Sequence, residues 1–256
     1  MFAIERRQRI KDILVKEKRI DVCNLSENFQ VSEVTVRRDL DKLEQEGFLI
    51  KTYGGAVLNE EHSTPIAYTD NLETPEEEKK LIAKIGAQMI NEGDAVFLGP
   101  GSTILEIVKL IKHNRMTVVT NDLLVALELK DCNETKVVVT GGDLIQSSSI
   151  LVGQIAQKLI QDIYLNKVFI SVKGVDLDSG YTVDSYEEAM LIKQILSITK
   201  EVIIVADYTK FNKTAFARLG SFNIAKKVIS NKQIPSEYKK FFFENNIKLY
   251  TTYELE

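Results

Sequence analysis

The sequence contains few of the residues from which disulfide frameworks and metal sites are built. Its 256 residues include two cysteines, two histidines, four prolines and no tryptophan. Cys23 and Cys132 lie far apart, and His62 and His113 do not cluster with them, so neither a disulfide framework nor a zinc site is indicated. Both thiols are most simply explained as small buried hydrophobic residues. We therefore expect no bound metal and no cofactor.

Long apolar runs are also missing. No stretch is long enough to span a bilayer, and residues 1–11 are too charged to contain the apolar core of a signal peptide. We therefore expect a cytoplasmic protein without a membrane partner. The composition, 44% hydrophobic and 27% charged, is typical of a globular chain with one or two domains and argues against a disordered or fibrous protein.

An excess of positive charge, which is common in nucleic-acid-binding proteins, is absent as well. The chain has 33 Lys and Arg against 37 Asp and Glu, a net charge of −4. The charge is uneven, because residues 1–57 hold 11 basic and 10 acidic side chains, a net of +1, whereas the remainder holds 22 and 27, a net of −5. The total therefore says little about the partner of either part.

Residues 1–57 show the pattern of a small helical domain that ends in a hairpin. Apolar residues at helical spacing predict an amphipathic helix from Glu5 to Glu17 and a second helix that Asp21 caps. A third capped helix, Glu33–Gln45, follows. The stretch Phe48–Val57 predicts a strand, a Gly-Gly turn and a second strand. Together these elements predict a winged helix-turn-helix.

The third helix has an apolar face and an opposite face that is basic and hydroxylated. Val36, Leu40 and Leu43 line the apolar face. The other face suits a DNA major groove, since Arg and Lys bind guanine or phosphate, Thr binds phosphate or a base edge, and Val contacts a thymine methyl. A solvated charged face is the alternative, as is plain surface for the two hairpin residues. The predicted DNA-contacting residues are Ser32, Val34, Thr35, Arg37, Arg38 and Lys42, with Lys51 and Tyr53 in the hairpin.

The chain after residue 57 predicts a linker and an α/β domain. Residues 58–75 are polar and lack periodicity, which is typical of a linker, whereas helical and strand-like segments alternate over residues 76–256. This alternation predicts a mostly parallel sheet covered by helices on both faces. The predicted strands are Ala95–Leu98, Thr117–Thr120, Lys136–Thr140, Val168–Val172, Val202–Ala206, Val228–Ser230 and Ile247–Tyr250. The predicted helices are Ile82–Ile90, Thr103–Ile111, Leu123–Leu129, Ile155–Ile163, Tyr186–Ile198 and Glu237–Asn245.

The residues that follow these strands are those of a site for anions and hydroxyl groups. Ligands of parallel sheets bind beyond the carboxyl ends of the strands. The first strand leads through a glycine loop into a helix, where the backbone can approach a phosphate, although such a turn also occurs for purely structural reasons. Later strand ends add amides, carboxylates and two lysines, so a phosphorylated sugar or polyol is the predicted ligand. The expected ligand-binding residues are Gly99, Gly101, Ser102, Thr103, Thr120, Asn121, Asp122, Gly141, Gly142, Lys173, Gly174, Glu188 and Lys210.

Motifs in both parts of the chain resemble the DeoR family of bacterial transcriptional regulators. In the first part they are Ser32–Leu40, Leu43, Gly47 and Tyr53–Ala56. In the second part they include Gly101–Thr103, Thr120–Asn121, Gly141–Gly142, Phe169–Gly174, Glu187–Ala189, Ala206–Asp207 and Lys210–Phe211. The resemblance implies a Rossmann-like effector domain, similar to ribose-phosphate isomerase and glucosamine-phosphate deaminase, that senses a phosphorylated sugar. It also implies a repressor of a carbohydrate-metabolism operon.

The resemblance to sugar-phosphate enzymes leaves two functions open. Isomerisation needs a carboxylate beside the phosphate site, but the turn after Val168–Val172 is acidic only further along, at Asp176 and Asp178. Binding without turnover and without catalytic residues is therefore favoured. The alternative is a sugar-phosphate isomerase or deaminase with an accessory DNA-binding domain. Because helix-turn-helix proteins read two half-sites, we expect a homodimer or homotetramer on double-stranded operator DNA.

Overall fold

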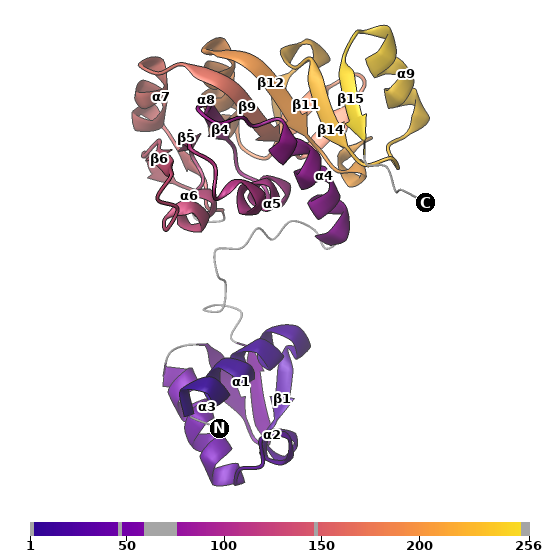
Figure 1. Ribbon diagram of the computed structural model, residues 1–256. Helices are drawn as coiled ribbons and strands as arrows, with labels where there is room; N and C mark the ends of the chain where they lie inside the picture. The colour runs from indigo at the N-terminus through magenta and orange to yellow at the C-terminus, as the bar shows by residue number, and fades with distance from the viewer. Residues whose placement is uncertain (1–2, 46–47, 59–75, 146–147, 252–256) are drawn as a thin grey trace. The chain divides into compact units, whose positions relative to one another are not determined.

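The computed structural model describes residues 3–45, 48–58, 76–145 and 148–251. The chain divides into two compact units, Met1–Pro65 and Ile66–Glu256 (Figure 1). Of the predicted linker, residues 58–75, only Leu58 belongs to the described part, and it is the last residue of a strand. The motif residue Gly47 lies outside the described residues as well.

The N-terminal unit is a winged helix-turn-helix, as predicted. Asp21 caps the second helix by accepting hydrogen bonds from the backbone N–H groups of Cys23 and Asn24. The Oγ of Ser32 accepts from the N–H of Thr35 at 3.3 Å and so begins the third helix. The elements are α1 (Ala3–Glu17), β1 (Arg19–Asp21), α2 (Val22–Phe29), α3 (Glu33–Gln45), β2 (Leu49–Thr52) and β3 (Gly55–Leu58). One apolar cluster, which includes Ile10, Leu14, Leu25, Val36, Leu40 and Leu49, joins the helices to the strands.

The wing differs from the predicted hairpin in its turn. Thr52 pairs with Gly55, so Tyr53 and Gly54 form the turn and Gly55 lies in β3. Gly55 also pairs with Asp21 in β1, a strand of three residues that is too short to show alternation in sequence. A Cβ atom on Gly55 would lie 1.9 Å from the carbonyl oxygen of Ile20. Only glycine fits at this point, where two backbones approach closely.

The C-terminal unit is built on a seven-stranded sheet in which every pairing is parallel, as predicted (Figure 1). The strand order is β15-β14-β12-β9-β4-β5-β6. The strands are β4 (Ala95–Leu98), β5 (Met116–Thr120), β6 (Thr135–Val139), β9 (Leu165–Ser171), β12 (Thr199–Val205), β14 (Lys227–Ser230) and β15 (Lys248–Thr251). The helices are α4 (Glu76–Gln88), α5 (Ser102–Ile111), α6 (Leu123–Leu129), α7 (Gln154–Gln161), α8 (Tyr186–Ser197) and α9 (Ser236–Glu244).

Alternating strand residues place apolar side chains on both faces of this sheet. In β4, Phe97 packs in the cluster that contains α7, α8 and α9, whereas Val96 and Leu98 pack in the cluster that contains α4, α5 and α6. In β12, Ile204 faces the first cluster and Ile203 the second. Successive side chains of a strand point to opposite faces, so a continuous apolar strand requires helices on both sides.

Two small antiparallel sheets and the exposure of one cysteine are not anticipated by the sequence. The sheets consist of strands of two to four residues, which are too short to show alternation. Cys23 is exposed and Cys132 is half-buried, so the prediction of two buried thiols is wrong for Cys23. The first sheet contains β10 (Gly174–Asp176), β11 (Gly180–Val183) and β13 (Ala217–Gly220), and the second β7 (Asp143–Leu144) and β8 (Leu151–Val152). Within the described ranges, no helix has the length and apolarity to cross a membrane.

Replacing Gly55 with alanine should destabilise the N-terminal unit by about 2 kcal/mol, because the added methyl group collides with the Ile20 carbonyl. Gly54→Ala is the matched control, since its Cβ would meet nothing closer than 3.7 Å, and it should change stability by less than about 0.5 kcal/mol. Hydrogen exchange of peptides from residues 19–58, measured in the full chain, reports both effects. Equal protection in the two variants would contradict the close approach of β1 and β3.

Candidate functional site

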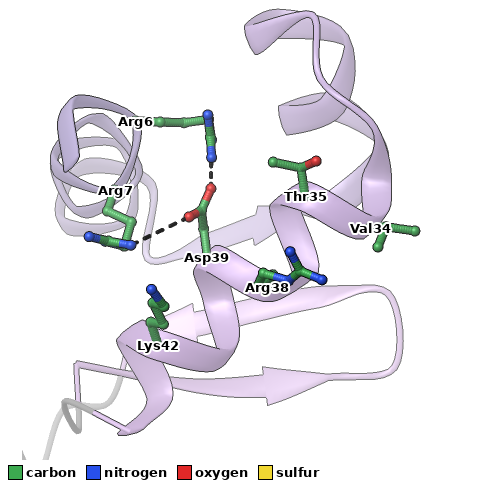
Figure 2. Close-up of a pocket in the computed structure, with 7 residues that line it drawn as sticks. All are labelled: Arg6, Arg7, Val34, Thr35, Arg38, Asp39 and Lys42. Carbon is green, nitrogen blue, oxygen red and sulfur yellow. Dashed lines mark hydrogen bonds and ion pairs between the residues drawn. The ribbon is translucent and has the colours of Figure 1, made fainter. Parts of the chain in front are cut away.

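The predicted DNA-facing side of α3 borders a hollow of about 230 Å³ between α1 and α3. Figure 2 shows side chains from both helices around it. The lining residues are Arg6 and Arg7 of α1, with Val34, Thr35, Arg38, Asp39 and Lys42 of α3. Val34 is 69% exposed, as a residue that contacts a base must be. Four of the predicted DNA-contacting residues therefore share one surface.

The other two basic side chains among the predicted DNA-contacting residues, Arg37 and Lys51, form ion pairs. Arg37 lies on the flank of α3, where its Nη2 is 3.4 Å from Glu33 Oε2. The Nζ of Lys51 lies 2.6 Å from Asp41 Oδ1 and 3.2 Å from Glu44 Oε2. Hydrogen bonds to these two carboxylates raise the pKa of Lys51 above its ordinary value. The side chains of Arg37 and Lys51 are thus less available to a phosphate than was expected from the sequence.

Arg38 and Lys42 differ from these two basic residues, because neither forms an ion pair with any residue that the structure describes. Ser32 serves as the helix cap, and its Oγ lies 3.0 Å from Thr35 Oγ1. Tyr53 is fully exposed at the turn of the wing. Among the predicted DNA-contacting residues, Arg38, Lys42 and the wing residue Tyr53 therefore have the most freedom to meet DNA.

A buried ion pair joins α1 to α3 beneath this surface. The Nε of Arg6 donates to Asp39 Oδ2 at 2.5 Å, and the two residues are 7% and 4% exposed. The Nη1 of Arg7 lies 3.8 Å from the other oxygen of Asp39. Sequence reasoning assigned no role to Arg6 or Arg7, because their helical spacing shows only an amphipathic helix and not which helix lies beside it.

A second candidate site lies where the chain changes direction within the parallel sheet. From β4 the chain forms β5 and β6 on one side and then crosses to β9, β12, β14 and β15 on the other. The carboxyl ends on either side of such a reversal diverge and form the usual ligand crevice of α/β sheets. Here these ends carry the loop Gly99–Thr103 after β4 and the pair Lys173–Gly174 after β9. The predicted phosphate loop therefore lies at the position where the topology favours a ligand.

The loop after β4 packs directly against β9. The N–H of Gly99 donates to the Phe169 carbonyl at 3.0 Å. Gly101 has φ 142°, and a Cβ atom there would lie 2.7 Å from the Cβ of Ser171. The positive φ and the close contact each favour glycine. The structural explanation for this glycine is thus real, and its approach to a phosphate remains a prediction.

Three polar residues are buried in succession after β5. The Thr120 hydroxyl donates to the Leu98 carbonyl at 2.7 Å and accepts from the Asp122 N–H at 3.0 Å, so it is occupied within the fold. The Nδ2 of Asn121 donates to the Leu151 carbonyl at 3.2 Å. Asn121 Oδ1 and Asp122 Oδ2 are buried and have no hydrogen-bond partner among the described residues. Tyr181 Oη and Ser230 Oγ share this property, and such groups are rare in folded proteins.

The other oxygen of Asp122 is engaged within the fold. Asp122 Oδ1 accepts from the Leu124 N–H at 2.9 Å, which caps α6, and from the Ser149 hydroxyl. Burial raises the pKa of Asp122 to about 6, against the smaller opposing effect of these two hydrogen bonds. The carboxyl group can therefore change its charge near neutral pH.

The remaining predicted ligand residues extend along the same edge. Lys173 follows β9, and its Nζ lies 3.8 Å from Asp184 Oδ2. Lys210 ends the 3-10 turn η1 (Tyr208–Lys210) after β12, and Glu188 is buried in the first turn of α8. Gly141 and Gly142 follow β6, four strand spacings or roughly 19 Å from β12. One small ligand cannot touch the backbone at both ends of this row.

A chain of hydrogen bonds links the turn that carries Lys210 to the start of α4. The Tyr208 N–H donates to Asn231 Oδ1 at 3.1 Å. The Nδ2 of Asn231 then donates to Glu78 Oε2 at 2.6 Å. Asn231 is completely buried, so this amide has a defined position. The turn is therefore fixed by contacts within the C-terminal unit.

Both units match known domain families. Residues 6–62 match the DeoR-like helix-turn-helix domain, and residues 74–232 match the DeoR C terminal sensor domain. The HTH-type transcriptional regulator GolR of Listeria innocua is 33% identical over 243 residues, which cover 94% of this chain and 96% of the relative. The glycerol-3-phosphate regulon repressor of Escherichia coli is 26% identical over 251 residues, which cover 97% and 99%. A ribose-5-phosphate isomerase in complex with phospho-erythronic acid aligns with a TM-score of 0.41 and 17% identity over 54% and 55% of the two chains.

The raised pKa of Asp122 predicts a pH-dependent effect of Asp122→Asn on stability. Since the folded chain holds this proton more tightly than the unfolded chain, the wild type loses stability as the pH rises from 4 towards 7, and the variant does not. The free energy of unfolding of the variant, relative to wild type, should therefore increase by about 2 kcal/mol between pH 4 and pH 7. Urea unfolding at the two pH values measures this difference.

Asp176→Asn is the control for this experiment, because hydrogen bonds, first from the backbone of Ser179, lower the pKa of Asp176. Its stability relative to wild type should change little between pH 4 and pH 7, since a carboxyl group with a lowered pKa is already ionised in the folded chain over this range. A stability difference for Asp122→Asn that is constant with pH would show that the folded chain does not retain the proton.

Proposed function

Because this chain belongs to the DeoR family of transcriptional regulators, we propose that it represses a carbohydrate-metabolism operon and that a phosphorylated sugar modulates its binding to the operator. The observation that carries the proposal is the surface of α3. There the basic side chains of Arg38 and Lys42, which form no ion pair with any described residue, lie beside a hydroxyl group and an exposed valine. This is the chemistry that reads a major groove. The similarity to the glycerol-3-phosphate regulon repressor of Escherichia coli supports the same kind of target.

The effector half of the proposal rests on the carboxyl edge of the parallel sheet. A phosphate at the Gly99–Thr103 loop would meet the N-terminus of α5, which favours anions. Ligand hydroxyl groups would meet the free acceptors Asn121 Oδ1 and Asp122 Oδ2, and Lys210 would supply positive charge. Together the loop and these side chains offer complementary partners for both ends of a sugar phosphate.

Binding without turnover is the function that this arrangement favours. One observation favours the enzyme alternative, since a carboxyl group with a pKa of about 6 beside a phosphate loop resembles an isomerase base. However, Asp122 Oδ1 caps α6 and accepts from the Ser149 hydroxyl, so this carboxyl group already has a structural role in the fold. Interconversion of aldose and ketose phosphates by the purified protein would overturn the sensor proposal.

Two half-sites in an operator require two winged units, so we also propose that the protein acts as a homodimer or homotetramer. Light scattering of the full chain tests this proposal, and a monomer that binds its operator tightly would contradict it.

The test uses a DNA duplex that the wild-type protein has selected from a random-sequence library. Arg38→Ala should weaken binding to this duplex by about 10-fold or more, because a guanidinium group that is not held in an ion pair is lost from α3. Arg37→Ala removes the same charge from the neighbouring position, but Arg37 is paired with Glu33 and lies outside the hollow, so its effect should be much smaller. Fluorescence anisotropy of the labelled duplex measures both affinities. If the two variants bind equally well, the assignment of the recognition face is wrong.

Lys210→Ala should weaken the binding of a sugar phosphate by about 10-fold while leaving DNA affinity unchanged, since it removes a cation from the rim of the site. Lys200→Ala is the control, because Lys200 lies near the opposite end of β12 and is exposed. A thermal-shift screen against a panel of pentose and hexose phosphates identifies the ligand, and calorimetry then compares the variants. Equal affinities would place the ligand elsewhere.

A further inference from the structure

The hollow between α1 and α3 holds more positive charge than the recognition helix alone supplies. Among the described residues, four basic side chains line it, with Asp39 as the one carboxylate. Asp39 is engaged mainly by Arg6, at 2.5 Å, and both side chains are buried. Arg7 is farther from Asp39, at 3.8 Å, and its side chain is 20% exposed against 8% for Arg6. Arg7 can therefore interact with an anion that enters the hollow.

The position of α1 beside α3 determines which part of a duplex Arg7 would meet. An α-helix with its side chains is about 10–12 Å wide, and the major groove is about 12 Å wide, so a recognition helix fills the groove. The sugar-phosphate backbone then lies on either side of it. Figure 2 shows Arg6 and Arg7 reaching towards Asp39 from the neighbouring helix α1. With α3 in the groove, side chains of α1 would face a wall of the groove, where phosphates are presented, and not the base edges.

We infer that the hollow binds one backbone phosphate of the operator and that Arg7 is a principal ligand of this phosphate. The inference rests on the DNA-binding function proposed above. A guanidinium group can donate two parallel hydrogen bonds to phosphate oxygens, and the ammonium group of Lys42, which lines the same hollow, adds a second positive charge. Arg6 has a different role, because its buried pair with Asp39 keeps α1 against α3.

The salt dependence of DNA binding tests this inference in the full chain. Each phosphate that a base neutralises contributes about 0.9 to the slope of log affinity against log salt concentration. Arg7→Ala should lower the slope by about 1 and weaken binding to the selected duplex and to an unrelated duplex by a similar factor, since a phosphate carries no sequence information. Arg7→Lys retains the charge and should retain most of the slope. Arg9→Ala is the matched control, because Arg9 is an exposed base of the same helix outside the hollow.

Three outcomes would overturn the inference: an unchanged slope in Arg7→Ala, an equal loss of slope in Arg9→Ala, or a loss of affinity for the selected duplex alone. Hydrogen exchange of α1 and α3 establishes that the variants are folded. Arg7→Gln, which removes the charge but retains a donor near Asp39, replaces Arg7→Ala if the latter unfolds. If Arg38→Ala weakens binding while the Arg7 variants do not, only this inference fails. If neither position affects binding, the proposed function fails with it.

Discussion

The buried ion pair between Arg6 and Asp39 determines how α1 lies against α3, and the DNA-facing surface depends on that placement. Removal of one partner from a buried pair leaves an uncompensated charge, at a cost of about 3–5 kcal/mol. If helix α1 moved away from α3, the charges of Arg6 and Asp39 would either become exposed to solvent or remain buried without a partner. An apolar pair of similar shape could stabilise the contact equally well, so the ion pair contributes more to the orientation of the helices than to stability. That orientation brings Arg7 to the rim of the hollow.

The pairing of acidic residues explains how a unit with almost no net charge can present a basic surface. All four acidic residues of α3 are paired with a base. Glu33 pairs with Arg37, Asp41 and Glu44 pair with Lys51, and the fourth acid is the partner of Arg6. Exposed pairs of this kind add little to stability. Their effect is electrostatic, because they neutralise the flanks of the helix and leave its positive charge concentrated at Arg38 and Lys42.

Repetition of a pattern over several turns or strand residues is what made parts of this fold predictable. The boundaries of β4 and α6 match the predicted segments Ala95–Leu98 and Leu123–Leu129. In β4, burial on both sides of the sheet gives a continuous apolar run, and in α6 the capping side chain of Asp122 marks the start of the helix. The strands β1 and β7 contain only three and two residues, so no period could reveal them. Their existence depends on close backbone approach, as at Gly55, which is a tertiary property.

The same limit separates the predictable from the unpredictable residues of the DNA-facing site. The spacing of residues along α3 was sufficient to place Arg38 on the outer face. The contact of Lys51 with a phosphate stays a prediction, and the sequence does not show that β2 lies beside α3 and brings the ammonium group of Lys51 to Asp41. The sequence does not place Arg7 beside α3, because that position arises from a contact between helices, and the adjacent pair of Arg6 and Asp39 spans 33 positions. Helical periodicity describes one helix at a time and contains no information on its neighbours.

The ligand motif of the C-terminal unit contains two kinds of residue that sequence alone does not distinguish. Gly101 and Thr120 are fully explained by packing and hydrogen bonds within the fold, so their place in the motif would be required even without a ligand. Asn121 and Asp122 each leave one buried oxygen without a partner among the described residues, so contacts within the fold account for only part of each side chain. In the N-terminal unit the same distinction separates Arg38 and Lys42, which form no ion pair with a described residue, from the basic side chains that are held in ion pairs. In both units, the groups that the fold leaves unsatisfied are the ones with the strongest physical reason to bind a partner.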